Sequence, residues 1–177
     1  MVKIKFPDGA IRSYESGLTP YEIASSISSG LARSIISSDF NGQKIETTTQ
    51  IFDDGNLTFY TWKDNEGKEA FWHSTAHLLA QVLEEFYDGI KLTIGPAISN
   101  GFYYDVDFGE HSMSEKDFLK IEKRMIEIAR EKHEFKLRSI SKKEALDFYK
   151  KNRNQYKTEL IENLKDGEIT FCDHDNF

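Results

Sequence analysis

The chain has only one cysteine, Cys172, among 177 residues, so no internal disulfide bond can form. This scarcity of cysteine is typical of a reducing cytoplasm, which is where we expect the protein to reside. No apolar run approaches the roughly 20 residues that span a bilayer, and residues 1–5 do not open an apolar signal segment. We therefore expect neither a membrane span nor a secretory leader.

Basic residues are outnumbered by acidic ones, 23 to 30, and the net charge of −7 argues against nonspecific binding to nucleic acids. The charge is unevenly distributed, because residues 115–157 carry 14 basic and 8 acidic side chains. This block could meet a phosphate backbone. Composition alone favours a pair of solvated amphipathic helices with ion pairs.

The first stretch of the chain predicts a hairpin followed by a helix. Residues 2–6 alternate apolar and polar, Pro7-Asp8-Gly9 is turn chemistry, and an extended pattern resumes over residues 10–14. Thr19 followed by Pro20 and Glu22 is typical of a capped helix start. We expect this helix to end near Gly30.

A second hairpin follows the helix. Asn41-Gly42, a strong turn signal, comes after an extended run over residues 35–40, and residues 57–62 form another short strand. A hairpin, a helix and further short strands are the element order of a β-grasp, ubiquitin-like unit. We assign residues 1–62 to this domain and the polar residues 63–68 to a linker.

Residues 69–177 predict a second α+β domain. Its expected elements are a helix over 70–87, strands over 91–98 and 102–108, a capped helix over 114–132, an extended segment over 135–140 and a capped helix over 141–151. The fold class is therefore α+β, with two domains.

The sharpest candidate for chemistry is the histidine pair of the 70–87 helix. His73 and His77 are four residues apart, so both imidazoles project from one helix face. Such a pair could ligate a metal, orient a water or hold a ligand. Metalloproteases place a glutamate after the first histidine, where this chain has Ser74, so a protease is disfavoured. Two satisfied structural histidines remain an equal alternative.

Three further segments carry residues that could bind a ligand or take part in catalysis. The segment from Gly95 to Asp105 is dense in glycine and aromatics, includes Tyr104, and lets a ligand approach backbone amides; an ordinary hairpin is the alternative. Lys157 follows a basic helix and, taken alone, is more often a surface lysine. Cys172 and His174 have too short a spacing for common zinc sites, so we expect surface residues.

The motifs together resemble a known family. His73-Ser74-Thr75-Ala76-His77 followed by Gly101-Phe102-Tyr103-Tyr104-Asp105 is similar to the editing domain of threonyl-tRNA synthetases, and the unit with the Phe6-Pro7-Asp8-Gly9 turn resembles their TGS domain. The resemblance covers essentially the whole chain. It implies a β-grasp TGS domain followed by an α+β editing domain in which the histidine helix packs on an antiparallel sheet.

The resemblance also implies site residues and a reaction. His73, His77 and Lys157 would be catalytic, and Tyr104 and Asp105 would shape the substrate pocket. The reaction would be hydrolysis of serine wrongly attached to threonine tRNA. The parent enzyme would attach threonine to that tRNA, bind its acceptor end, use ATP, Mg and a downstream zinc ion, and form a homodimer. No metal or other cofactor is expected in residues 1–177, and neither DNA nor membrane is an expected partner.

One departure from the family pattern concerns the end of the site. The family completes it with a Cys-x-x-x-His pair inside a Cys-Arg-Gly-Pro-His run, which residues 1–177 do not contain. We therefore expect an editing domain truncated at its C-terminal end and inactive by itself.

Two rivals remain. A free-standing editing hydrolase would have no TGS unit. A TGS-containing RNA-binding or regulatory module without catalysis would not carry the histidine helix.

Overall fold

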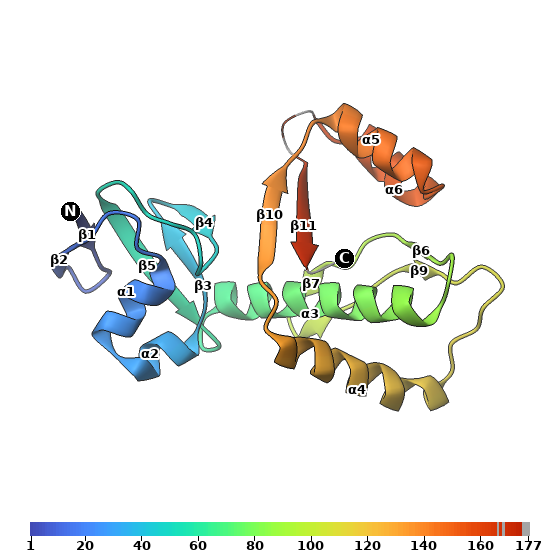
Figure 1. The fold of residues 1–177 in the computed structure, drawn as a ribbon, viewed down its shortest axis with the longest axis horizontal. Coiled ribbons are helices and arrows are strands. Elements are labelled where there is room, and N and C mark those ends of the chain that lie inside the picture. Colours follow the sequence, from blue (N-terminus) through green and yellow to red (C-terminus); the bar gives the residue numbers. More distant parts are fainter. Residues whose placement is uncertain (166, 168, 175–177) are drawn as a thin grey trace. The chain divides into compact units, whose positions relative to one another are not determined.

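The computed structural model describes residues 1–165, 167 and 169–174 (Figure 1). The chain divides into two compact units: one comprises Met1–His73 with Ala97–Ser99, and the other Ser74–Pro96 with Asn100–Phe177. Helix α3 (Asn65–Phe86) begins in the first unit and continues in the second. None of the described helices is both long and apolar enough to cross a membrane.

The first unit is a five-stranded mixed sheet with strand order β2-β1-β5-β3-β4, as expected for a β-grasp fold. Neighbouring strands run antiparallel except for β1 and β5, which pair in parallel. The strands are β1 (Val2–Lys5), β2 (Ile11–Tyr14), β3 (Ile35–Phe40), β4 (Gln43–Ile45) and β5 (Gly55–Thr61). Ile4, Ile23 and Leu57 are fully buried and join the sheet to helix α1 (Pro20–Ile27).

The start of α1 is the capping box that the sequence predicts. The Glu22 amide donates to the Thr19 hydroxyl at 3.2 Å, and the Thr19 amide donates to the Glu22 carboxylate at 2.8 Å. The predicted helix end near Gly30 is wrong. Ser28 is extended, and its hydroxyl accepts from the Leu31 amide, so it ends α1 and starts a separate short helix, α2 (Ser29–Ser34).

Helix α3 begins inside the segment that was predicted to be a linker. A tight turn joins β5 to the helix, because the Asp64 carboxylate accepts from the Thr61 amide at 2.8 Å and from the Thr61 hydroxyl at 2.9 Å. The Asp64 carbonyl then accepts from the Lys68 amide at 3.0 Å, as in a first helical turn. The polar character of residues 63–68 therefore reflects the turn before α3 and the first residues of that helix.

In the described residues, the second unit adds three further helices and short antiparallel ribbons. The helices are α4 (Glu115–Glu131), α5 (Lys142–Lys151) and α6 (Gln155–Glu162). The strands of this unit are β6 (Lys91–Leu92), β8 (Gly101–Phe102), β9 (Val106–Asp107), β10 (Phe135–Ser139) and β11 (Thr170–His174), while the short strand β7 (Ala97–Ile98) is counted with the first unit. Strand β6 pairs with β9, and β10 pairs with β11.

The strands predicted over 91–98 and 102–108 are shorter than expected. Pro96 has no amide hydrogen for a ladder, and Gly95 lies directly against the Tyr104 ring, so each predicted strand is interrupted. Both predicted capping boxes in this unit do form, at the starts of α4 and α5.

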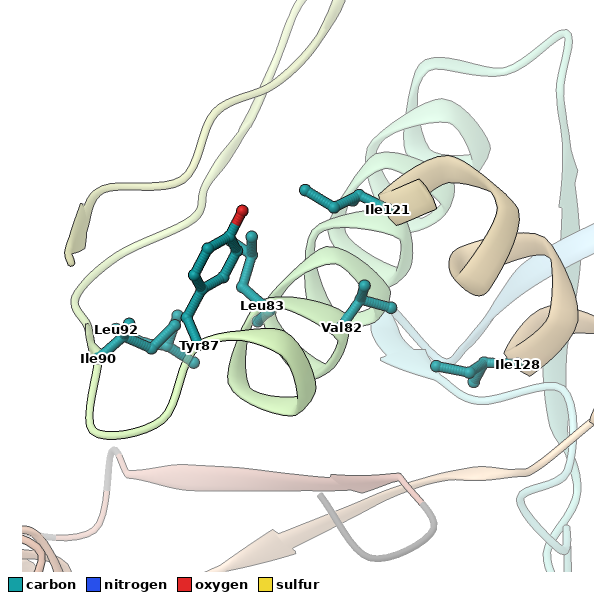
Figure 2. Close-up of a cluster of buried hydrophobic side chains, with 8 residues drawn as sticks. Val82, Leu83, Tyr87, Ile90, Leu92, Ile121 and Ile128 are labelled. Carbon is teal, nitrogen blue, oxygen red and sulfur yellow. The ribbon is translucent and has the colours of Figure 1, made fainter. Parts of the chain in front are cut away.

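The core of the second unit forms where α3 meets α4 and the β6–β9 ribbon. Figure 2 shows Val82 and Leu83 of α3 facing Ile121 and Ile128 of α4, with Leu92 at the ribbon. All five side chains are buried. A second, smaller cluster joins α5 to α6 through residues that include Ala145, Ile161 and Ile169. The histidine helix was expected to pack on an antiparallel sheet. In the structure, separate antiparallel ribbons take the place of that sheet.

Candidate functional site

The two predicted histidines lie one turn apart on α3. The His73 residue is exposed overall, yet partial burial of its imidazole lowers the pKa, and the Glu69 carboxylate opposes that shift. His73 is therefore mainly neutral at pH 7 and can accept or donate a hydrogen bond. The partly buried His77 ring lies 6.1 Å from the ring of Phe135 in β10.

Lys157 lies in the first turn of α6, where its amide donates to the Asn154 side chain at 3.0 Å. The side chain is partly buried. Burial lowers the pKa of the Lys157 ammonium, and the Glu84 carboxylate of α3 opposes that shift. Lys157 thus differs from an ordinary surface lysine, because a nearby carboxylate stabilises its charge while part of its hydration is lost.

Glu84 is a further residue of the candidate site, one that the sequence motifs did not reveal. Burial raises the pKa of its carboxyl group, and the Lys157 charge lowers it. Glu84 follows His77 by seven residues, two turns of helix, so both side chains project from the same face of α3. That spacing is the signal by which it could have been found.

Tyr104 belongs to the same electrostatic cluster. Burial, together with the nearby Tyr149 and Glu84, raises its pKa to about 12. Burial and Glu84 likewise raise the pKa of Tyr149 in α5. Both phenols are therefore protonated at pH 7 and can donate hydrogen bonds.

The predicted substrate-binding pair lines an open groove of about 450 Å³. Tyr104 and Asp105 form part of it, and Asp107 and Tyr156 complete its polar lining, with Thr93, Val106 and Phe108 beside them. Asp105 is exposed, and its backbone continues the β6–β9 pairing by donating to the Ile94 carbonyl at 2.9 Å. The fold thus brings Tyr104 and Asp105 into one groove with Tyr156, the residue preceding Lys157.

The expectation that Cys172 and His174 are surface residues is wrong for His174, which is 2% exposed. Its Nδ1 lies 2.9 Å from the amide oxygen of the buried Gln81, and its ring stacks on Phe135 at 4.3 Å. Pairing of β11 with β10 draws His174 into the interior, while Cys172 stays partly exposed.

Among the residues that the structure describes, no three histidine, cysteine, aspartate or glutamate side chains gather as metal ligands would. The cluster of Glu84, Lys157, Tyr104 and Tyr149 offers a carboxylate near an ammonium, together with phenol donors. These groups can orient water and stabilise a developing negative charge on a bound ester.

Comparison with known proteins defines the class of the first unit. Residues 2–61 match the TGS domain, which agrees with the β-grasp topology. Residues 2–61 of the first unit are therefore a TGS domain.

The whole chain matches one kind of enzyme. It is 59% identical over 177 residues to the threonine–tRNA ligase of Flavobacterium psychrophilum and 62% identical over 177 residues to that of Flavobacterium johnsoniae, and these matches cover 100% of this chain. It is 48% identical over 171 residues to the threonine–tRNA ligase of Cytophaga hutchinsonii, a match that covers 97% of this chain. The chain spans 27%, 27% and 26% of the lengths of these relatives. The resemblance to the N-terminal region of threonyl-tRNA synthetases is thereby confirmed.

Proposed function

We propose that residues 1–177 serve as the N-terminal region of a threonine–tRNA ligase and contribute to proofreading by hydrolysing seryl-tRNA. The observation that carries this proposal is the cluster of Glu84, Lys157 and Tyr104 beside the histidine helix, in a chain that matches such ligases along its whole length. A TGS module without catalysis is less favoured, because the similarity extends far beyond residues 2–61.

The chemical need for such a site follows from the substrates. Serine is threonine without a methyl group, and a missing methyl is worth only about 1–3 kcal/mol of discrimination in a binding pocket. A second site that admits serine and excludes threonine removes the errors that remain. Tyr104 and Asp105, which line the groove, are the side chains we assign to substrate binding.

Hydrolysis requires water to add to the carbonyl carbon of the seryl ester. The water proton passes to a base, and the bond from carbon to the ribose oxygen breaks as that oxygen gains a proton. We assign orientation of the water to His77 and, one turn earlier, to the mainly neutral His73. Lys157, held near Glu84, supplies positive charge toward the oxyanion that forms during the reaction.

The parent enzyme would bind the acceptor end of threonine tRNA, and the basic block at residues 115–157 can attract its phosphates. Aminoacylation would use ATP and Mg. We place these, together with a zinc ion and the contacts of a homodimer, in the part of the ligase that the relatives carry beyond this region. For residues 1–177 we propose no cofactor. The cytoplasm, where tRNA is charged, is the proposed location.

The test uses a chimera in which residues 1–177 replace the matching region of the Flavobacterium johnsoniae ligase. Release of serine from mischarged threonine tRNA is followed for the chimera, its Lys157→Ala variant and the 177-residue chain alone. We expect Lys157→Ala to slow deacylation by about 10²- to 10⁴-fold, the range of a single acid–base or electrostatic group. The 177-residue chain alone should be slower than the chimera, because it lacks the family's Cys-x-x-x-His pair.

Lys165→Ala is the matched control, because Lys165 is an exposed lysine outside the basic block. It should leave deacylation unchanged. Wild-type rates in the Lys157→Ala chimera would refute the assigned role of Lys157, and absence of deacylation by the unmodified chimera would refute the proofreading proposal itself.

A further inference from the structure

The turn that carries Lys157 is tied to a distant part of the second unit by two side-chain hydrogen bonds. Asn154 donates from Nδ2 to the Leu92 carbonyl of β6 at 2.9 Å. Tyr156 donates from its hydroxyl to Oδ2 of Asp107 in β9 at 2.9 Å. The two bonds span 62 and 49 residues of sequence, so they join segments that local structure does not bring together (Figure 1).

The side-chain amide group of Asn154 makes two hydrogen bonds. Its oxygen caps α6 by accepting from the Lys157 amide at 3.0 Å, while its nitrogen reaches the β6 strand. The Asn154 side chain therefore links the backbone of Lys157 to β6.

The anchor points themselves are held firmly. Leu92 is 5% exposed and belongs to the core between α3, α4 and the β6–β9 ribbon (Figure 2). The Asp107 carboxylate also accepts from the Gly109 amide at 2.9 Å, which fixes its orientation. The β6–β9 ribbon thus holds the start of α6 at two points, on either side of Gln155.

We propose that Asn154 and Tyr156 are positioning residues that set Lys157 in its reactive place by fastening the start of α6 to the β6–β9 ribbon. This inference rests on the proposed proofreading function. Lysine has a long, flexible side chain, so the location of its ammonium depends on where its backbone is anchored. A displacement of about 1 Å at a reacting group can cost about 10²-fold in rate.

The two bonds can be removed without adding charge. In Asn154→Ser the hydroxyl can still cap the helix, but it is too short to reach β6. Tyr156→Phe removes only the hydroxyl that reaches Asp107. We expect each variant of the chimera to lose about 10- to 100-fold in kcat for seryl-tRNA deacylation, with little change in KM.

A readout beyond stability separates positioning from a structural role. Once the turn is released, the Lys157 ammonium regains water and its pKa rises toward the ordinary value, so the limb of the pH–rate profile that reports Lys157 should move to higher pH. The matched controls are Asn163→Ser, which removes a bond to Glu159 within the same helix, and Tyr21→Phe, an exposed tyrosine of the TGS domain. Both should keep the wild-type kcat and pH profile.

The outcomes are distinguishable from failure of the proposed function. If Lys157→Ala is inactive while Asn154→Ser and Tyr156→Phe keep wild-type kcat, the positioning role is refuted and the function stands. A lower melting temperature with unchanged kcat and pH profile would likewise refute the positioning role, because the two bonds would then contribute to stability alone. If the Lys157→Ala variant deacylates seryl-tRNA normally, the assigned role of Lys157 is refuted, and the positioning role that rests on it is refuted as well.

Discussion

Gly67 offers a sharp test of how α3 is placed at the end of the TGS domain. Gly67 lies in the first turns of α3, six residues before His73. A methyl group at this position would meet the Thr61 backbone, with its carbonyl oxygen closest and its carbonyl carbon at 2.7 Å. Backbone atoms cannot rotate away as the end of a side chain can. Glycine is therefore required by the close approach of β5 and α3.

Two opposing contributions determine how Gly67→Ala changes the free energy of unfolding. Gly→Ala inside a helix normally stabilises by about 1 kcal/mol, because alanine is the better helix former. Overpacking against well-packed neighbours costs about 1–3 kcal/mol, and contact with a fixed carbonyl belongs at the upper end of that range. We therefore expect Gly67→Ala to lower the free energy of unfolding of the TGS domain by about 2 kcal/mol.

The assay is urea denaturation followed by tryptophan fluorescence. The chain has two tryptophans, Trp62 and Trp72, and both lie in the first unit, so the signal reports that unit. The control is Gly30→Ala in α2, where the nearest atom to an added methyl is the Ser28 hydroxyl oxygen at 3.5 Å. That substitution should be neutral or stabilising. Equal stabilities of the two variants, or a more stable Gly67→Ala, would refute the close approach of α3 to β5.

Two further predictions concern the second unit. Glu84→Gln should lower the pKa of Lys157 further, because it removes the carboxylate that stabilises the ammonium, and the limb of the pH–rate profile that reports Lys157 should move to lower pH. Glu85→Gln, which removes the same charge from the next residue, should not shift that limb; equal shifts would contradict the pairing. Gln81→Leu should lower the free energy of unfolding by about 1–3 kcal/mol, because buried His174 loses its amide partner, and unchanged stability in urea would count against that bond.

Local sequence was sufficient for the elements whose geometry is decided within a few residues. The hairpin turns at Asp8-Gly9 and Asn41-Gly42 and the capping box of Thr19 and Glu22 depend only on neighbours, and all of them form as predicted. The His73 and His77 pair is local in the same sense, because a spacing of four residues places two side chains on one helix face. These patterns were also sufficient to identify the family.

Tertiary structure decided the features that depend on residues distant in sequence. The β10–β11 pairing, and with it the burial of His174, joins segments more than thirty residues apart, so composition near residue 174 could not reveal it. The environment of Lys157 likewise arises only when α6 docks on β6 and β9 near Glu84 of α3. Side-chain spacing determines which groups share a face, whereas their burial, pKa and partners are set by which segments pack together.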